Sequence, residues 1–382
     1  MKRTQFIVAL ACVALVAGAA QAEEKYVGGG FEASGSVVTG AGFQHNTANV
    51  VDAGTMDDDG AISGFGVLGN YYGVLPAAKQ DNWRFFVDSV ELDLMKSFGE
   101  NIRFRADLDF GRAASGSSAA FLLEQAYATA NIPAGNGIEF LLGRFNAPIG
   151  FDSVDVADST LISQTFLVRS GVRPTNVTGG KFYYAFNDSV DFHFYLANQF
   201  FGDTADQAGK EYPGGGLRLG YNWGDEGTES TVGFSAFGAT EGALEKNYSF
   251  AGDVDFNWWV NESFAVGGEV LFRRDPAATT GGSKQETLSG LVNLNYAFSD
   301  VWDGTFRYNY TKQYDSTPAT RGAGAATSDF LGFEGSAHEA SLGVGYAVAD
   351  GAWLRFEGRF DWLKAAVKGY DYGAAVAFAY NF

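Results

Sequence analysis

The sequence predicts an all-β protein: a transmembrane antiparallel β-barrel of about 16 strands, preceded by a cleaved signal peptide. Three observations predict this fold. The chain begins with the pattern of a secretory signal. It then contains repeated segments of about nine to eleven residues in which apolar and polar side chains alternate. The connections between these segments are alternately short and long.

The first 22 residues predict export from the cytoplasm. They contain in order a positive start, an apolar stretch and a small-residue cleavage site: Lys2 and Arg3, Phe6–Val16, and Ala20–Ala22. The apolar stretch is too short to span a bilayer as a helix. We therefore expect residues 1–22 to be a signal peptide and residues 23–382 to be a barrel in the outer membrane of a bacterium with two membranes.

Composition excludes several functional classes. The single cysteine, Cys12, is removed with the signal peptide, so neither a disulfide framework nor a Cys-ligated metal is expected in the mature protein. Removing Lys2 and Arg3 leaves 24 basic residues against 45 acidic ones, a formal net charge of −21, which excludes nucleic acid as a partner. The 51 glycines and 34 phenylalanines against only 7 prolines favour strands joined by turns.

The strand segments have one apolar and one polar face. In Ile102–Phe110, apolar side chains alternate with charged ones, which is the two-residue period of a β-strand. Segments around Asp253 and Arg355 repeat the pattern. A charged face this regular suits a hydrated interior. We expect these residues to face the lumen: Arg103, Arg105, Asp107, Asp109, Asp253, Asp255, Arg355, Glu357, Arg359 and Asp361.

The connections give the strand count. Seven are short: Phe98–Asn101, Ile132–Gly137, Phe186–Ser189, Trp223–Ser230, Val260–Ser263, Ser299–Gly304 and Ala349–Ala352. Between them fall eight longer or more polar segments, near 45–82, 111–120, 146–179, 198–214, 239–247, 273–286, 312–336 and 364–369. Strict alternation of these two kinds predicts sixteen strands, with short periplasmic turns and longer outer loops.

The end of the chain has aromatic or apolar residues at alternate positions, closing on Phe378, Tyr380 and Phe382. This pattern resembles the C-terminal assembly signal of outer-membrane barrels. The resemblance implies that the barrel-assembly machinery binds the last strand.

Residues 146–179 form a long connection in which Pro148 and Gly150 stop the preceding strand. Connections of this length are usually functional or disordered, and the apolar residues of this one argue against disorder. We expect the loop to fold inward and to form the pore constriction. The charged residues proposed for it are Arg144, Asp152, Asp155, Asp158, Arg169 and Arg173. The alternative is an outward flap whose arginines pair with carboxylates of the barrel wall.

Other motifs carry little chemistry. Asp57, Asp58 and Asp59 are a weak candidate for a divalent metal site, because the later Glu of a calcium loop is missing. Gly64–Gly69 matches the letters of a dinucleotide fingerprint but lacks a buried strand before it and a helix after it. The three histidines belong to no catalytic motif. We expect no cofactor and no enzymatic activity.

Several segments near the middle of the chain resemble one family of porins: Gln125–Tyr127, Pro133–Gly137, Gly143–Asp152, Gly171–Pro174 and Thr178–Gly179. Over about residues 120–200 the chain is similar to the β-barrel porin-2 (OmpL-like) family, and elsewhere only to barrels in general. The resemblance implies a porin-type barrel with no settled substrate.

Together these features predict a passive, water-filled channel for small hydrophilic solutes or ions. The alternative is a non-conducting scaffold or binding barrel that holds a partner protein. The expected partners are outer-membrane lipid, the barrel-assembly machinery during biogenesis, and the solutes themselves. The length of the chain also allows a homotrimer.

Overall fold

The computed structural model describes residues 31–46, 80–110, 122–153, 156–169, 171–198, 213–240, 248–275, 285–314, 334–364 and 368–382. Three sequence-based predictions lie outside these ranges: the signal peptide, the acidic group Asp57–Asp59, and Asp155. In the described part of the chain, no helix has the length and hydropathy needed to cross a membrane.

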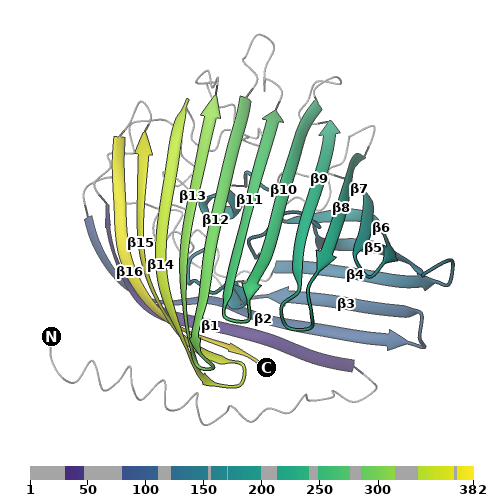
Figure 1. Ribbon diagram of the computed structural model, residues 1–382, viewed down its shortest axis with the longest axis horizontal. Helices are drawn as coiled ribbons and strands as arrows, with labels where there is room; N and C mark the ends of the chain where they lie inside the picture. The colour runs from purple at the N-terminus through teal and green to yellow at the C-terminus, as the bar shows by residue number, and fades with distance from the viewer. Residues whose placement is uncertain are drawn as a thin grey trace.

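The chain forms one closed barrel of sixteen antiparallel strands in sequence order, in which β1 pairs with β16 (Figure 1). This confirms the predicted fold class and strand count. The strands are β1 Phe31–Asn46, β2 Gln80–Phe98, β3 Ile102–Asp109, β4 Leu122–Ile132, β5 Ile138–Asn146, β6 Asn176–Asn187, β7 Val190–Ala197, β8 Gly214–Trp223, β9 Ser230–Thr240, β10 Tyr248–Asn261, β11 Phe264–Asp275, β12 Gln285–Ser299, β13 Trp302–Tyr314, β14 Gly335–Ala349, β15 Ala352–Lys364 and β16 Lys368–Asn381. Two one-turn helices, η2 Val156–Asp158 and α2 Phe166–Arg169, lie between β5 and β6.

The short turns lie where the sequence places them. Gly99 between β2 and β3 and Gly351 between β14 and β15 have φ angles of 65° and 72°, a conformation that favours glycine. The opposite ends of the strands carry the longer connections, except for the three residues between β15 and β16. Because barrels of this kind have short periplasmic turns, we assign the turn end to the periplasmic side and the loop end to the outer side.

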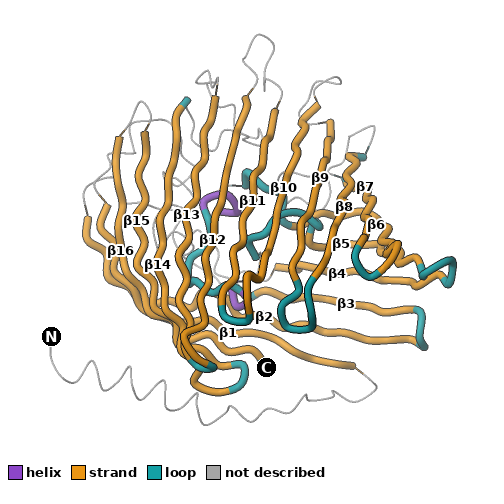
Figure 2. The backbone as a smooth tube through the Cα atoms, viewed as in Figure 1, coloured by secondary structure: helices purple, strands orange, loops and turns teal. Residues whose placement is uncertain are grey.

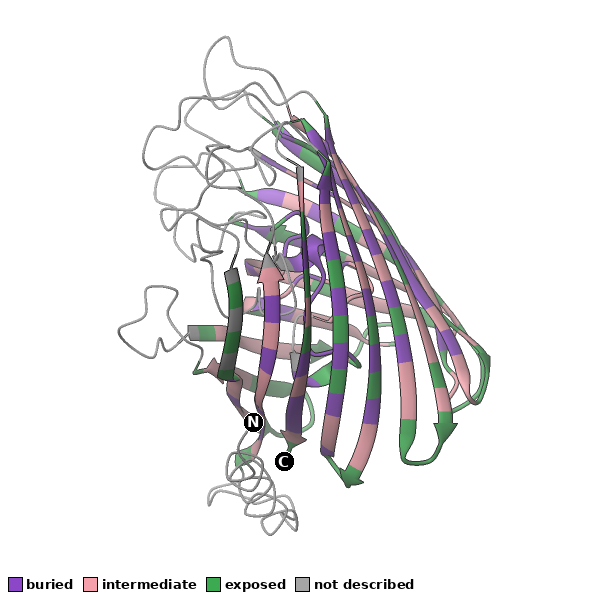
Figure 3. Ribbon diagram, turned by 90° about the vertical axis from the view of Figure 1, so that its left-hand side faces the viewer, coloured by how far each residue is buried: buried purple, intermediate pink, exposed green. Residues whose placement is uncertain are grey.

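Many strands have an exposed apolar face and a buried polar face, whereas the interior face of β5–β7 and β9 also carries a buried apolar cluster that includes Phe145. In β15, Phe356 and Phe360 are 44% and 42% exposed, whereas Glu357 and Arg359 between them are 3% exposed. Figure 3 shows buried and exposed residues alternating along the strands. Apolar side chains on the outer face suit contact with lipid, and the closed sheet pairs the backbone polar groups of neighbouring strands with one another.

The last strand closes the barrel. Register partners of β1 and β16 run from Ser36 with Asn381 to Asn46 with Asp371. Beyond them, the backbone N–H of Phe382 donates to the carbonyl of Gly35 (2.9 Å), and the N–H of Gly35 donates to the carbonyl of Phe382 (3.0 Å). The ring of Phe382 is 45% exposed at the periplasmic rim.

We expect Phe382→Asp to lower the amount of folded barrel several-fold while export continues. The substitution puts a charge where the closing strand ends, and it removes the terminal aromatic of the proposed assembly signal. The measurement is the heat-modifiable band in outer-membrane fractions. Phe298→Asp is the matched control, because Phe298 is 63% exposed near a periplasmic turn but is not terminal. Equal losses in both variants would contradict an assembly role for Phe382.

Candidate functional site

The connection between β5 and β6, residues 147–175, is called the inner loop here, and its described residues, 147–153, 156–169 and 171–175, lie inside the barrel (Figure 2). Its helix η2 lies against β1, β2 and β16, and its helix α2 against β13. Figure 2 shows both helices and the adjoining loop segments within the ring of strands. Near the start of the inner loop, Gly150 has a φ of 84°. A Cβ there would lie 2.1 Å from Nη1 of Arg173 and 2.6 Å from Oε2 of Glu269, so the close approach requires glycine.

Three buried carboxylates hold the backbone of the inner loop. They are called the wall glutamates: Glu269 of β11, Glu339 of β14 and Glu357 of β15. Each accepts backbone N–H groups of the loop at N···O distances between 2.7 and 2.9 Å: Phe151 donates to Glu269, Phe166 to Glu339, and Ile162 and Ser163 to Glu357. Hydrogen bonds to a charged acceptor are stronger than neutral ones, so these contacts fix the path of the loop.

Two arginines of the barrel wall balance the negative charge of the wall glutamates and also bind the inner loop. Arg307 of β13 donates through Nε to Glu339 (2.8 Å) and through Nη2 to Oγ of Ser163 (3.1 Å). Arg359 of β15 donates to the carbonyl of Gln164 (2.8 Å) and to Ser163 (3.0 Å), and it lies 3.3 Å from Glu339. Buried charges are costly unless they are paired and hydrogen-bonded, and both conditions are met here.

Other arginines bind the inner loop from the wall or from within the loop. Arg173 of the loop pairs with Glu269 at 2.9 Å, and the two side chains are 1% and 0% exposed. Arg173 also donates to the carbonyl of Asp152 (2.5 Å). From the wall, Arg273 donates to the carbonyl of Gly171 (2.8 Å), and Arg355 donates to that of Ala157 (2.9 Å). The loop is therefore fastened at points along most of its length.

Apolar side chains of the inner loop also pack against the barrel wall. Ile162 packs in one cluster with Ala157 and with small residues of β1 and β16. Leu167 packs in another with Val172 and Leu271. Burying an aliphatic side chain of this size contributes about 1.5–3 kcal/mol. The loop is thus part of the barrel's core.

The structure separates the predicted constriction residues. Arg144 donates to the carbonyl of Glu124 on the wall (2.9 Å), and Arg173 faces Glu269. Asp152 braces the loop internally, because it accepts from the N–H and Oγ1 of Thr165 at 3.2 and 2.7 Å. Asp158 is exposed. Arg169 lies in α2, and its side chain is outside the described part of the structure.

A cavity of about 280 Å³ lies between the inner loop and strands β10–β13. Asp152 and Asp158 line it from the loop, and Arg307 lines it from the wall. Both signs of charge therefore border the same space, although the basic group comes from the wall rather than from the loop.

The ten residues predicted to face the lumen all lie on the strand face opposite the exposed apolar side chains. Arg105 and Asp109 are half-buried, and Arg103 is exposed near a periplasmic turn. The other predicted lumen-facing residues are buried: Asp107, Asp253, Asp255, Arg355, Glu357, Arg359 and Asp361. One of them, Asp255, forms an ion pair with Arg218 of β8.

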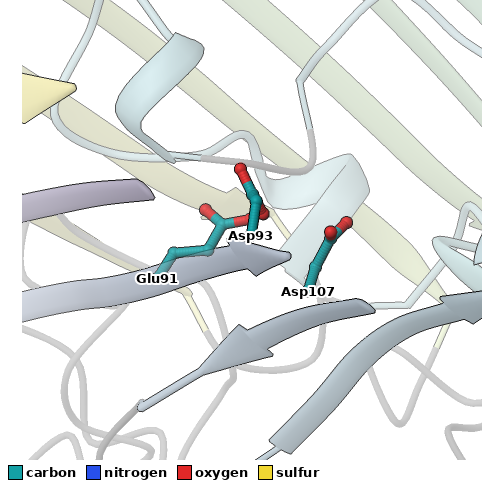
Figure 4. Close-up of side chains that lie close together, drawn as sticks. All are labelled: Glu91, Asp93 and Asp107. Atoms are coloured by element: carbon teal, nitrogen blue, oxygen red, sulfur yellow. The ribbon is translucent and has the colours of Figure 1, made fainter. Parts of the chain in front are cut away.

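An acidic cluster on β2 and β3 faces the same interior. Carboxylate oxygens of Glu91, Asp93 and Asp107 lie within 4.8 Å of one another (Figure 4). Arg105 donates to Asp107 (2.6 Å) and lies 3.7 Å from Asp93, and Gln125 also donates to Asp107. Glu91 and Asp93 were not among the predicted residues. The alternation in Val90–Leu94 is the signal that could have found them.

Comparison with known proteins gives one family match and several structural likenesses. A sequence profile of the family described as "Putative beta-barrel porin-2, OmpL-like" matches residues 30–376. No curated protein sequence matches the chain.

Three solved structures illustrate the structural likeness. The outer-membrane channel DcaP of Acinetobacter baumannii is similar with a TM-score of 0.64 and 13% identity, over 94% of this chain and 100% of that one. An anion-selective porin from Comamonas acidovorans has a TM-score of 0.58 and 13% identity, over 92% and 99%. OmpT of Vibrio cholerae in its trimer form has a TM-score of 0.55 and 11% identity, over 92% and 99%. At these identities the likeness shows the fold.

Proposed function

The chain belongs to the β-barrel porin-2, OmpL-like family, and on that premise we propose that it forms a passive, water-filled channel for small hydrophilic solutes or ions in a bacterial outer membrane. A hollow barrel of sixteen strands is wide enough to enclose an aqueous channel. The observation that carries the proposal is the inner loop, which is held inside this barrel by the wall glutamates. A rigid loop inside the barrel narrows the water-filled channel to a defined width.

We place the narrowest point between the inner loop and the wall formed by β2 and β3. The loop is fastened to β11 and β13–β15, and it packs on β1, β16 and the part of β2 around Phe86. The wall opposite β11 carries the acidic cluster Glu91, Asp93 and Asp107. Asp158, the exposed acid of η2, borders the cavity on the β10–β13 side of the loop, and Arg173 is turned away into the wall. Charged groups around a constriction filter ions by their sign.

We expect a weak preference for cations. Arg105 within the acidic cluster keeps the cation preference small. The negative net charge of the chain, −19, strengthens that preference. The measurement is the reversal potential in a salt gradient, first with the wild type and then with Glu91→Gln/Asp93→Asn, which should shift it toward zero.

Asp350→Asn is the matched control, because Asp350 is an exposed acid in a periplasmic turn and should leave the reversal potential unchanged. A clear anion preference of the wild-type channel would contradict this prediction.

The alternative function is a non-conducting barrel that scaffolds a partner protein. Single-channel recording in planar bilayers separates the two functions, because the channel predicts discrete conductance steps and the scaffold predicts none. The homotrimer stays a prediction, and the trimer form of Vibrio cholerae OmpT supports it only through the shared fold.

A further inference from the structure

The outward face of β13–β15 carries two lysines at the outer ends of the strands. Strand register aligns Lys312 of β13 and Lys364 of β15 on either side of Ser336 of β14, and the two lysines are called the basic row here. Their neighbours along the strands, Gln313 and Leu363, are 0% and 3% exposed and face the interior. The basic row therefore faces away from the lumen, toward the lipid.

An aromatic surface lies directly below the basic row. It is called the aromatic platform: Tyr308, Tyr310, His338, Phe360, Trp362 and Tyr370. His338 stacks on Trp362, with ring centroids 4.5 Å apart and planes 9° apart. The hydroxyl of Tyr308 lies 2.8 Å from Nδ1 of His338, which fixes the centre of the platform.

The basic row and the aromatic platform lie at the level of the outer leaflet. The strand ends that carry them lie on the side of the long connection between β13 and β14, residues 315–334, whereas the turn between Ala349 and Ala352 closes the periplasmic end of β14 and β15. Aromatic side chains in such barrels lie at the boundary between hydrocarbon and headgroups. Positions one step further out are therefore level with lipid headgroups.

The charge of the row is unusual for this chain. The protein has a net charge of −19, yet within the described residues Lys312 and Lys364 have no ion-pair partner. Cationic groups of this kind are available to an external anion. Phosphate groups are the anions that basic side chains bind at a membrane surface.

We propose that the basic row and the aromatic platform bind a phosphorylated lipid of the outer leaflet, with the phosphate at the lysines and the acyl chains along the apolar strand faces below. The proposal rests on the outer-membrane location in the proposed function.

The test measures binding of lipid A carrying two phosphates to the purified full-length protein, by native mass spectrometry in detergent. One lysine near charged lipid contributes about fivefold in affinity, so Lys312→Gln/Lys364→Gln should weaken binding about 30-fold. Dephosphorylated lipid A should bind the wild type as weakly as lipid A binds the double variant. Lys96→Gln is the matched control, because Lys96 lies 4.4 Å from the exposed ring of Phe31 at the periplasmic end, and binding should be unchanged.

Three results would overturn the proposal: unchanged binding by the double variant, an equal loss in Lys96→Gln, or equal affinity for dephosphorylated lipid A. Inorganic phosphate that binds as tightly as lipid A would assign the row to a free anion and would also overturn it. Conductance of the same preparations is a separate readout. A wild-type protein that binds lipid A through the row but does not conduct would support this site while contradicting the channel.

Discussion

Deleting Val154–Phe166 from the inner loop is expected to raise the single-channel conductance several-fold. The deletion removes η2 and the backbone held by Glu357 and Glu339, so the interior is left without the segment that narrows it. The barrel itself should still close, because all sixteen strand pairings lie outside the deletion. The measurement is conductance in planar bilayers, with heat-modifiable migration as the test of folding.

A shortened connection between β13 and β14, lacking residues 318–328, is the control for loss of loop mass. It should leave the conductance close to that of the wild type. A folded deletion of Val154–Phe166 with unchanged conductance would place the constriction elsewhere, with the connection between β1 and β2 as the next candidate.

Arg173→Met is expected to loosen the inner loop and make the channel current noisy. The substitution leaves Glu269 buried without its cation, and breaking a buried pair in this way costs about 3–5 kcal/mol. The loop also loses the bond from Arg173 to the carbonyl of Asp152. We expect frequent transitions between conductance levels, with the barrel still folded.

The double variant Arg173→Met/Glu269→Met is the decisive comparison. Replacing both members of a buried pair with apolar residues is often close to neutral, so the double variant should be quieter than the single one. Arg173→Lys keeps the charge but not the paired donors of the guanidinium, and its noise should be intermediate. Identical noise in the single and double variants would show that the pair does not fasten the loop.

The sequence predicts the barrel because the signals for its parts are local. Strand faces are defined by a two-residue period, as in Ile102–Phe110, and the turns by short polar or glycine-containing segments such as the one at Gly99. Each of these can be recognised without knowing which strand lies beside it. The antiparallel order then follows from the alternation of short and long connections.

The arrangement of the inner loop could not be predicted in the same way. Its partners are distant in sequence: 118 positions separate Phe151 from Glu269, and 173 separate Phe166 from Glu339. An irregular segment has no period that relates one of its residues to a given strand. The sequence suggests that Arg173 is functional, but only the closed barrel brings it to Glu269 instead of to an opening.

The wall glutamates bind main-chain N–H groups, which every residue except proline possesses. A substitution at Thr160, which borders the cavity between the loop and the wall, can therefore change the lining of that cavity without removing an anchor. In evolutionary terms, the selectivity of the passage can diverge between descendants while the scaffold remains constant. Mutational tolerance should be high at Thr160 and low at Gly150, where any side chain would collide with Arg173.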